Sequence, residues 1–415
     1  MLYRTICVKV FIFYKYVDII MLDTFLRREI MNNTGTVMHV NSNNMDVVAE
    51  PPTSEEVSSE EPPSKQWNDW RWQLQNRITT VEEIQRLSGH PLSISEQASK
   101  KFPISITPYY FGLIKKFDDS DPIFRMSVAQ SSELLEIMSS DPLCEDDMMP
   151  VKNLVHRYRD RALVISTSFC AMYCRYCTRK RSVGSADHAI KDSELQNIVQ
   201  YLRLHPEITD VIISGGDPFT FETNKLENII RAIRSVDTVD IIRIGTKTPV
   251  VMPQRITEEL VNMLKKYHPI FVNTHFNHPV EITPESKAAC ELLVNNGIVV
   301  GNQSVLLRGV NDDKFLYEDL CRKLIRMRVR PYYLFQCDLV NGVEHFRTKV
   351  AAGIEIMEHL RGRLSGIAIP QYVIDSPGGM GKIPILPQYL ISQTPDKVIL
   401  RNFEGKMVEY PEPKY

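Results

Sequence analysis

The sequence has no excess of charge of either sign, because 49 Lys and Arg residues stand against 51 Asp and Glu residues in a chain of 415. A protein that binds nucleic acid or an anionic membrane surface through its overall field usually carries a clear surplus of cationic residues. The near equality of cationic and anionic residues excludes a strongly cationic overall field. We therefore expect no nucleic-acid partner and no membrane partner, and we expect ligands to be recognised at discrete sites.

The sequence also lacks an apolar stretch long enough to cross a bilayer, which takes about 20 residues. Charged residues interrupt the apolar N-terminus, among them Arg4, Lys9 and Lys15. The only candidate core of a secretion signal, residues 8–14, contains Lys9, and no small-residue cleavage site follows it. We therefore expect a cytoplasmic protein.

Cysteine is sparse, and five of the eight residues are scattered along the chain. Secreted disulfide frameworks belong to shorter and denser chains, so a reducing compartment fits better. The other three, Cys170, Cys174 and Cys177, stand together in TSFCAMYCRYC. Three thiolates can bind three irons of a cubane 4Fe-4S cluster and leave the fourth iron open. Structural zinc is the alternative, but it normally needs a fourth Cys or His at a conventional spacing.

The first 150 residues divide into two parts. Residues 1–65 end in a Pro-, Ser- and Glu-rich stretch with little to bury, which predicts a disordered, non-catalytic extension and linker. Residues 66–150 are predicted to form a mostly helical N-terminal region. Within it, Thr80 and Glu83 indicate a capping box at the start of a helix that ends near Gly89.

Residues 151–342 alternate short apolar runs with helical patterns. Apolar strands joined by helices predict a parallel sheet that is covered by helices and can close part-way into a barrel. The six predicted strands are residues 161–168, 209–216, 240–250, 270–279, 299–307 and 330–338. The expected fold class is α/β, a partial TIM-like (βα)6 barrel, and its chemistry is expected at the carboxyl ends of the strands.

Residues 343–415 are predicted to form a C-terminal extension. A helix at about 343–361 precedes a glycine-rich turn that ends at Lys382, and a hairpin with Glu404 and Gly405 at its turn follows. The glycine-rich turn is no Walker loop, because two required positions hold other residues. Lys382 is either a Schiff-base lysine for pyridoxal phosphate or a solvent-exposed lysine.

The segment SGGDP, residues 214–218, follows the second predicted strand. Adjacent glycines let a backbone approach a ligand closely, and the Asp217 carboxylate can accept a hydrogen bond from an ammonium group. Considered alone, the same residues are more typical of a plain strand-to-helix turn.

CxxxCxxC after the first predicted strand, with SGGDP after the second, resembles the radical S-adenosylmethionine (SAM) superfamily. From Trp67 to about Pro411 the chain resembles the lysine 2,3-aminomutase family within it. The matching blocks, in order, are WNDWRWQLQNRI, HRYRDRALVISTSFCAMYCRYCTRKR, VIISGGDPF, NTHFNHP, GNQSVLL, YYLFQCDLVNGVEHFRT, VIDSPGGMGKIP and VILRNFEGK.

This resemblance implies an isomerase that interconverts L-lysine and L-β-lysine by migration of an amino group, started by a 5′-deoxyadenosyl radical. It implies a 4Fe-4S cluster, SAM and pyridoxal 5′-phosphate as cofactors, an electron donor such as flavodoxin or ferredoxin, and a homo-oligomer. Family members with zinc bind it through a cysteine-rich tail and a loop cysteine. Zinc is not expected here, because the sequence ends at Tyr415 without such a tail and has Asp313 at the loop position.

The resemblance also assigns cofactor residues. Lys382 matches the lysine that holds pyridoxal phosphate. The region that grips this cofactor corresponds to Arg157, Tyr158 and Arg161. The positions near SAM correspond to Gly215, Gly216, Asp217, His275 and Gln303. Without the resemblance, a solvated basic turn and satisfied polar residues of a barrel interior explain these side chains.

Three further residues carry the substrate prediction. Arg179 is similar to the residue that pairs with the substrate carboxylate, and Asp338 and Asp375 are similar to the pair that holds the ε-ammonium of lysine. Two carboxylates around one ammonium disfavour a neutral or acidic substrate side chain. Alternatively, Asp338 caps a helix and Asp375 forms a turn.

Three rival functions stay open at this point. One is an aminomutase for glutamate, arginine or another amino acid. Another is an enzyme that modifies a lysine of a translation factor or attaches β-lysine to it. The last is a non-catalytic scaffold that keeps the barrel.

Overall fold

The six apolar runs form six neighbouring parallel strands of one sheet, in chain order. The computed structural model describes residues 66–89, 91–184 and 188–414, so the predicted extension at 1–65 lies outside the described residues. The six strands are β2 (Arg161–Thr167), β3 (Asp210–Gly215), β4 (Ile241–Gly245), β5 (Ile270–Thr274), β6 (Val299–Leu306) and β7 (Arg330–Gln336). The predicted α/β fold with a partial parallel barrel is confirmed.

Alternate residues of each strand face two different environments. In β4, Ile242 and Ile244 are fully buried, whereas Arg243 and Gly245 line a cavity inside the barrel. Successive side chains of a strand point to opposite faces, so one face packs against helices and the other builds the interior. This interior is where ligands can bind.

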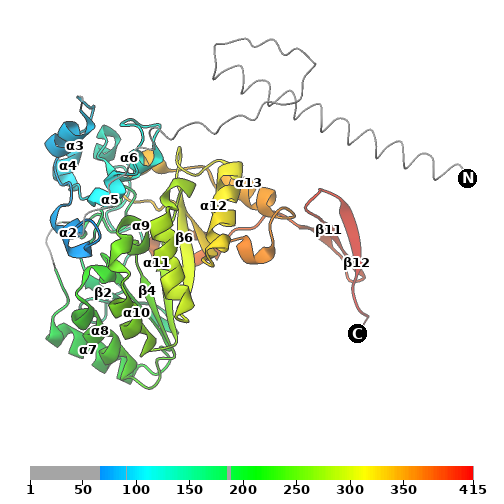
Figure 1. The fold of residues 1–415 in the computed structure, drawn as a ribbon. Coiled ribbons are helices and arrows are strands. Elements are labelled where there is room, and N and C mark those ends of the chain that lie inside the picture. The colour runs from blue at the N-terminus through cyan, green and yellow to red at the C-terminus, as the bar shows by residue number, and fades with distance from the viewer. Residues whose placement is uncertain (1–65, 90, 185–187, 415) are drawn as a thin grey trace, which may run out of the picture. The chain divides into compact units, whose positions relative to one another are not determined.

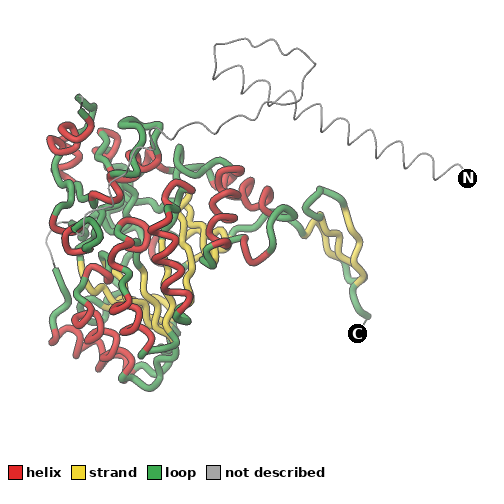
Figure 2. Tube along the Cα trace, in the orientation of Figure 1, coloured by secondary structure: helices red, strands yellow, loops and turns green. Residues whose placement is uncertain are grey.

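Helices connect successive strands and form a layer outside them (Figures 1 and 2). α8 shows the pattern, because Leu226, Ile229, Ile230 and Ile233 recur at helical spacing and are buried. One helix of at least eight residues follows each of the six strands; in order, these are α7 (Asp192–Leu204), α8 (Thr223–Arg234), α10 (Glu258–Lys265), α11 (Pro284–Asn295), α12 (Lys314–Arg326) and α13 (Val350–Leu360). Asp313, the residue at the zinc-loop position, caps α12 by accepting from two backbone N–H groups.

The sheet has nine strands, because further strands extend both edges. β1 (Leu154–Tyr158) pairs antiparallel with β2, β8 (Gln371–Asp375) pairs parallel with β7, and β9 (Lys382–Pro384) pairs antiparallel with β8. The first of the six predicted strands begins at residue 161, so most of the segment HRYRDR was expected to precede the sheet. That expectation is wrong, because Arg157 and Tyr158 lie within β1.

Side chains, not a backbone ladder, link the two edge strands. The backbone N–H of Lys382 in β9 donates to the Tyr158 hydroxyl in β1 at 2.9 Å. Arg157 of β1 also donates to Asp375 at the end of β8, with 3.2 Å between Nη2 and Oδ2. We call this junction the seam of the barrel.

The helical N-terminal region contains five short helices, α2 (Trp70–Gln75), α3 (Val81–Ser88), α4 (Glu96–Lys101), α5 (Pro108–Phe111) and α6 (Pro122–Ser127). The predicted capping box is confirmed, because the Thr80 hydroxyl accepts from Glu83 N and the Glu83 carboxylate accepts from Thr80 N. Gly89 ends α3 at φ 77°, a left-handed conformation that glycine adopts without strain.

The C-terminal extension contains α13 and a small three-stranded antiparallel sheet. The predicted hairpin is confirmed as β11 (Lys397–Arg401) and β12 (Met407–Pro411), and β10 (Leu390–Gln393) is an additional strand. The predicted helix at 343–361 is shorter, because α13 begins at Val350. Across the described part of the chain, no helix combines the length and apolar character that crossing a membrane demands.

Candidate active site

The cysteine loop leaves the carboxyl end of β2 and is held by the helical N-terminal region. Arg175, between the second and third cysteines, is fully buried and forms an ion pair with Glu133, with 2.7 Å between Nη2 and Oε2. Its remaining donors reach the carbonyls of Phe102 and Pro103. Because a buried guanidinium must be paired, these contacts fix the loop.

The environment of the three cysteines fits an iron-sulfur cluster. Phe102, Tyr173 and Val183 form an apolar group against Cys170 and Cys177. Burial, and then the Asp217 carboxylate, raise the pKa of the Cys170 thiol well above its usual value. The thiolate form therefore needs the positive charge of bound iron.

No three His, Cys, Asp or Glu side chains among the described residues are arranged to hold one metal ion. A cubane does not need such an arrangement, because each cysteine binds a different iron.

The SGGDP turn packs directly against the cysteine loop. A Cβ on Gly216 would lie 2.3 Å from the carbonyl oxygen of Phe169, and Gly215 has φ 114°. Asp217 is buried, and its carboxylate accepts from the Thr246 hydroxyl at 2.6 Å and from Lys247 N at 2.8 Å. The glycines thus allow the two loops to touch, and Asp217 ties the turn to the end of β4.

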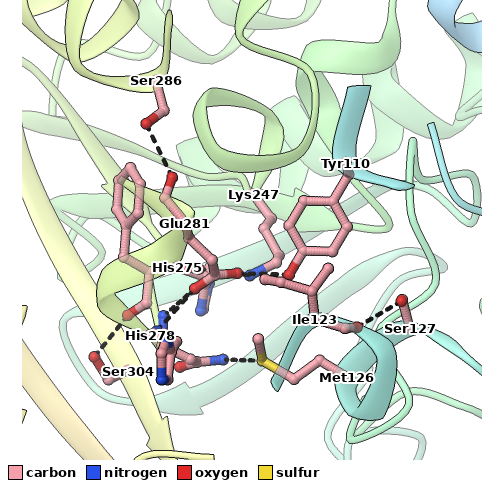
Figure 3. A network of polar contacts seen from close by, with 12 residues as sticks. Tyr110, Ile123, Met126, Ser127, Lys247, His275, His278, Glu281, Ser286 and Ser304 are labelled. Atoms are coloured by element: carbon pink, nitrogen blue, oxygen red, sulfur yellow. Dashed lines mark hydrogen bonds and ion pairs between the residues drawn. The ribbon is translucent and has the colours of Figure 1, made fainter. Parts of the chain in front are cut away.

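A buried carboxylate lies beside this turn. Glu281 accepts from Lys247 Nζ at 2.8 Å and from the Tyr110 hydroxyl at 2.7 Å, and both side chains point to it in Figure 3. Burial alone would raise the pKa of Glu281, but Lys247 and the other donors lower it below its usual value. Lys247 Nζ also donates to the carbonyl of His275 at 2.7 Å. The network anchors the end of β5 to the N-terminal region.

A cavity of about 250 Å³ occupies the barrel interior. Seven of the predicted site residues line it: Arg157, Tyr158, Arg161, Arg179, His275, Gln303 and Lys382. They come from distant parts of the sequence, so the fold brings together the predicted pyridoxal, SAM and substrate positions. Burial, and then Lys247, lower the pKa of His275 to about 4. The glycines and Asp217 of the SGGDP turn are not among the residues that line this cavity.

Lys382 faces a carboxylate and two aromatic rings. Its Nζ lies 3.0 Å from Asp375 Oδ2, 5.8 Å from the centre of the Tyr158 ring and 5.6 Å from that of Phe335. A primary amine in a cavity that Arg157 and Arg161 also line fits an aldehyde cofactor that carries a phosphate. Lys382 therefore is not a free surface lysine.

The two carboxylates of the predicted acidic pair have different hydrogen-bond partners. Asp375 binds Lys382 and Arg157, whereas Asp338 accepts from the Thr178 hydroxyl at 2.5 Å. Burial raises the pKa of Asp338 to about 6, and the nearby Asp375 carboxylate adds to this effect. Both carboxylates also line a second hollow. Asp375 connects this hollow to the barrel cavity, because it contacts Lys382, which lines that cavity.

Arg179 is paired with a residue that the sequence analysis missed. Its Nε and Nη2 donate to the two carboxylate oxygens of Glu145, at 2.9 and 2.6 Å. Glu145 belongs to a loop of the helical N-terminal region with no recognisable motif. Arg243, which also lines the cavity, could have been noticed as a cation inside the apolar run DIIRIGT.

Comparison with known proteins identifies relatives of this chain. A family model described as lysine-2,3-aminomutase matches residues 357–415, and one described as radical SAM superfamily matches residues 164–317. L-lysine 2,3-aminomutase of Clostridium subterminale is 51% identical over 354 residues, which cover 84% of this chain and 85% of that protein. The enzyme of the same name from Fusobacterium nucleatum subsp. nucleatum is 50% identical over 84% of each chain. Glutamate 2,3-aminomutase of Clostridioides difficile is 46% identical over 83% of this chain and 82% of that protein.

The two matched regions contain the two chemical centres described above. The superfamily match includes the three cysteines and the SGGDP turn, and the aminomutase match includes Lys382. Identities near one half, over more than four-fifths of each chain, extend well beyond these motifs. The chain therefore belongs to the lysine 2,3-aminomutase family of the radical SAM superfamily.

Proposed function

We propose that this chain catalyses the interconversion of L-lysine and L-β-lysine with pyridoxal phosphate as an additional cofactor. The observation that carries the proposal is the surrounding of Lys382, which shares one cavity with Arg179 and contacts Asp375. This arrangement offers one cation for an α-carboxylate and carboxylates for a distant ammonium group.

The superfamily implies a 4Fe-4S cluster and SAM. Cys170, Cys174 and Cys177 would hold the cluster. The residues proposed for SAM are Gly215, Gly216, Asp217, His275 and Gln303. When bound, the pair supplies a carbon radical that removes a hydrogen atom from the substrate. Around it, burial and the Lys247 charge keep His275 neutral at pH 7, so its ring can donate or accept a hydrogen bond without adding charge.

Lys382 would hold pyridoxal phosphate, with Arg157, Tyr158 and Arg161 at its phosphate end. The cofactor, when bound, supplies a conjugated system that delocalises unpaired electron density. The Tyr158 hydroxyl fixes the backbone of Lys382 at 2.9 Å, and Asp375 holds its amine at 3.0 Å. These contacts orient the amine toward the cavity and keep it from swinging into solvent.

The acidic pair favours lysine over glutamate as the substrate. Asp375 already binds an alkylammonium group, that of Lys382, which is chemically the same group as the ε-ammonium of a lysine substrate. Asp338 lies close enough to Asp375 for the two carboxylates to influence each other's charge. The side-chain carboxylate of glutamate would meet two like charges here, which costs binding energy.

The proposal is tested by anaerobic turnover of lysine with dithionite, SAM and pyridoxal phosphate. We expect β-lysine from the wild type, no product from Lys382→Ala, and a product yield reduced at least tenfold for Asp338→Asn. Asp319→Asn serves as a matched control, because Asp319 is 50% exposed and pairs with Lys323 on helix α12. Wild-type turnover of glutamate but not lysine, or full activity of Lys382→Ala, would overturn the proposal.

A further inference from the structure

We propose that Glu145 is a positioning residue that fixes Arg179 and thereby sets the affinity for the substrate carboxylate. This inference rests on the proposed function, in which Arg179 receives that carboxylate. The two residues are distant in the sequence. Glu145 has no other role in the site described so far.

The contact is bidentate and buried. Arg179 Nε lies 2.9 Å from Glu145 Oε2 and Nη2 lies 2.6 Å from Oε1, while the two side chains are 19% and 8% exposed. Burial alone would raise the pKa of Glu145, but the charge and hydrogen bonds of Arg179 lower it below its usual value. Glu145 is therefore ionised at neutral pH and forms a charge-assisted pair.

The geometry leaves one edge of Arg179 for a ligand. A guanidinium presents two edges that suit a carboxylate, one through Nε and Nη2 and the other through Nη1 and Nη2. Glu145 occupies the first edge. The second includes Nη1, which donates to no described residue, and Arg179 lines the same cavity as Lys382. A substrate carboxylate can thus bind in a second fork without displacing Glu145.

Glu145 is itself held by its surroundings. It belongs to the acidic loop, which we define as residues 141–148. Gly378, in the turn before Lys382, donates its N–H to the carbonyl of Pro142 at 2.9 Å. His156, next to Arg157, donates its N–H to the carbonyl of Met148 at 2.9 Å.

The acidic loop is also anchored to the segment that follows the cluster cysteines. Arg181 forms ion pairs with Asp141 at 3.3 Å and with Asp146 at 3.1 Å. The acidic loop thus contacts three parts of the site: the turn before Lys382, strand β1 and the segment after the cluster cysteines. The Glu145 carboxylate is therefore held in place relative to all three. A fixed partner reduces the rotamer entropy that Arg179 must lose when a ligand binds.

The test compares two ligands in the pyridoxal-loaded holoenzyme, with binding followed by the change in cofactor absorption. L-lysine carries the carboxylate, whereas 1,5-diaminopentane has the same chain and amines without it. In Glu145→Gln we expect the affinity for lysine to fall about tenfold and the affinity for diaminopentane to stay within about twofold, because only the carboxylate depends on Arg179. Asp319→Asn, on helix α12 and outside the acidic loop, should leave both affinities unchanged.

A second variant separates orientation from folding. Glu145→Asp keeps the charge but withdraws the carboxylate by one methylene group, so we expect a smaller loss that is again confined to lysine. Parallel kinetics should show a raised KM for lysine with a less affected kcat, because the substrate still reacts once it is bound.

Four results would overturn the inference. Tighter binding of lysine by Glu145→Gln would identify Glu145 as a competitor of the substrate, and equal losses for both ligands would indicate only a damaged fold. Unchanged affinities for both ligands in Glu145→Gln, when the wild type binds lysine better than diaminopentane, would refute the role of Glu145 alone. A wild type that binds lysine no better than diaminopentane would instead refute the proposed role of Arg179, and this inference with it.

Discussion

Replacing Asp338 by Asn should remove a titration that the wild-type enzyme shows near pH 6. The pKa of Asp338 is raised to about 6 by burial and by the Asp375 carboxylate, while the Thr178 hydroxyl and the Lys382 amine act in the opposite direction. If the ionised carboxylate holds the ε-ammonium of lysine, binding is lost as the pH falls through this value.

The size of the effect follows from the fraction of Asp338 that is ionised. With a pKa of about 6, that fraction is about nine-tenths at pH 7 and about one-tenth at pH 5. We therefore expect kcat/KM for lysine, which reports the free enzyme, to fall about tenfold over this interval. An ordinary Asp, with a pKa of about 3.9, would change by less than about a tenth. Bound lysine brings an ammonium group to the carboxylate, so the midpoint for kcat should lie at a lower pH.

The assay measures kcat/KM for lysine between about pH 5 and pH 8 at saturating SAM, with the cluster absorbance recorded at each pH to exclude loss of iron. The ε-ammonium of lysine does not titrate in this range, since its pKa is about 10.4. Asp338→Asn should be less active and insensitive to pH over this range. The reasoning is wrong if the wild type is equally flat, or if the variant keeps the wild-type midpoint.

Three further substitutions test other parts of the site. Glu281→Gln should lower the free energy of unfolding by about 3 kcal/mol or more, because it leaves a buried ammonium without its ion pair; chemical denaturation measures this, and a loss below about 1 kcal/mol would contradict it. Gly216→Ala should prevent the cysteine loop from closing, because its Cβ would lie 2.3 Å from the Phe169 carbonyl, so reconstituted protein should hold less iron than the wild type; an unchanged iron content would show that the loops can separate without harm. Tyr158→Phe should weaken retention of pyridoxal phosphate up to about tenfold, since the Lys382 backbone loses one hydrogen bond; fluorescence titration of the cofactor would show an unchanged affinity if this bond has no role.

The sequence predicted those features that depend on local pattern. Continuous apolar runs marked all six central strands, and Thr80 with Glu83 marked a helix start, because each signal is complete within a few neighbouring residues. β1 escaped notice because HRYRDR is polar: Arg157 faces the cavity and makes an ion pair with Asp375, so its side chain is buried without being apolar. Polar strands that line a site carry no hydrophobic signal.

The partners of the site residues were the least predictable part. Arg179 and Asp338 could be singled out, but Glu145 and Glu281 could not, because each acquires its role only through contacts with distant segments. The sequence also did not reveal that the two acids of the pair have different partners. In the structure, Asp375 binds the Lys382 amine.

The seam of the barrel has a consequence for how the protein is made. The contacts that join its edges link Arg157 to Asp375 and Tyr158 to Lys382, pairs that lie more than 200 positions apart in the chain. Closing such a long loop is entropically unfavourable and slow. The contact between the cysteine loop and the SGGDP turn, in contrast, needs no residue beyond Asp217. During synthesis, the half of the site that would hold the cluster can therefore fold while the ribosome still retains the lysine turn, and the pyridoxal half forms last.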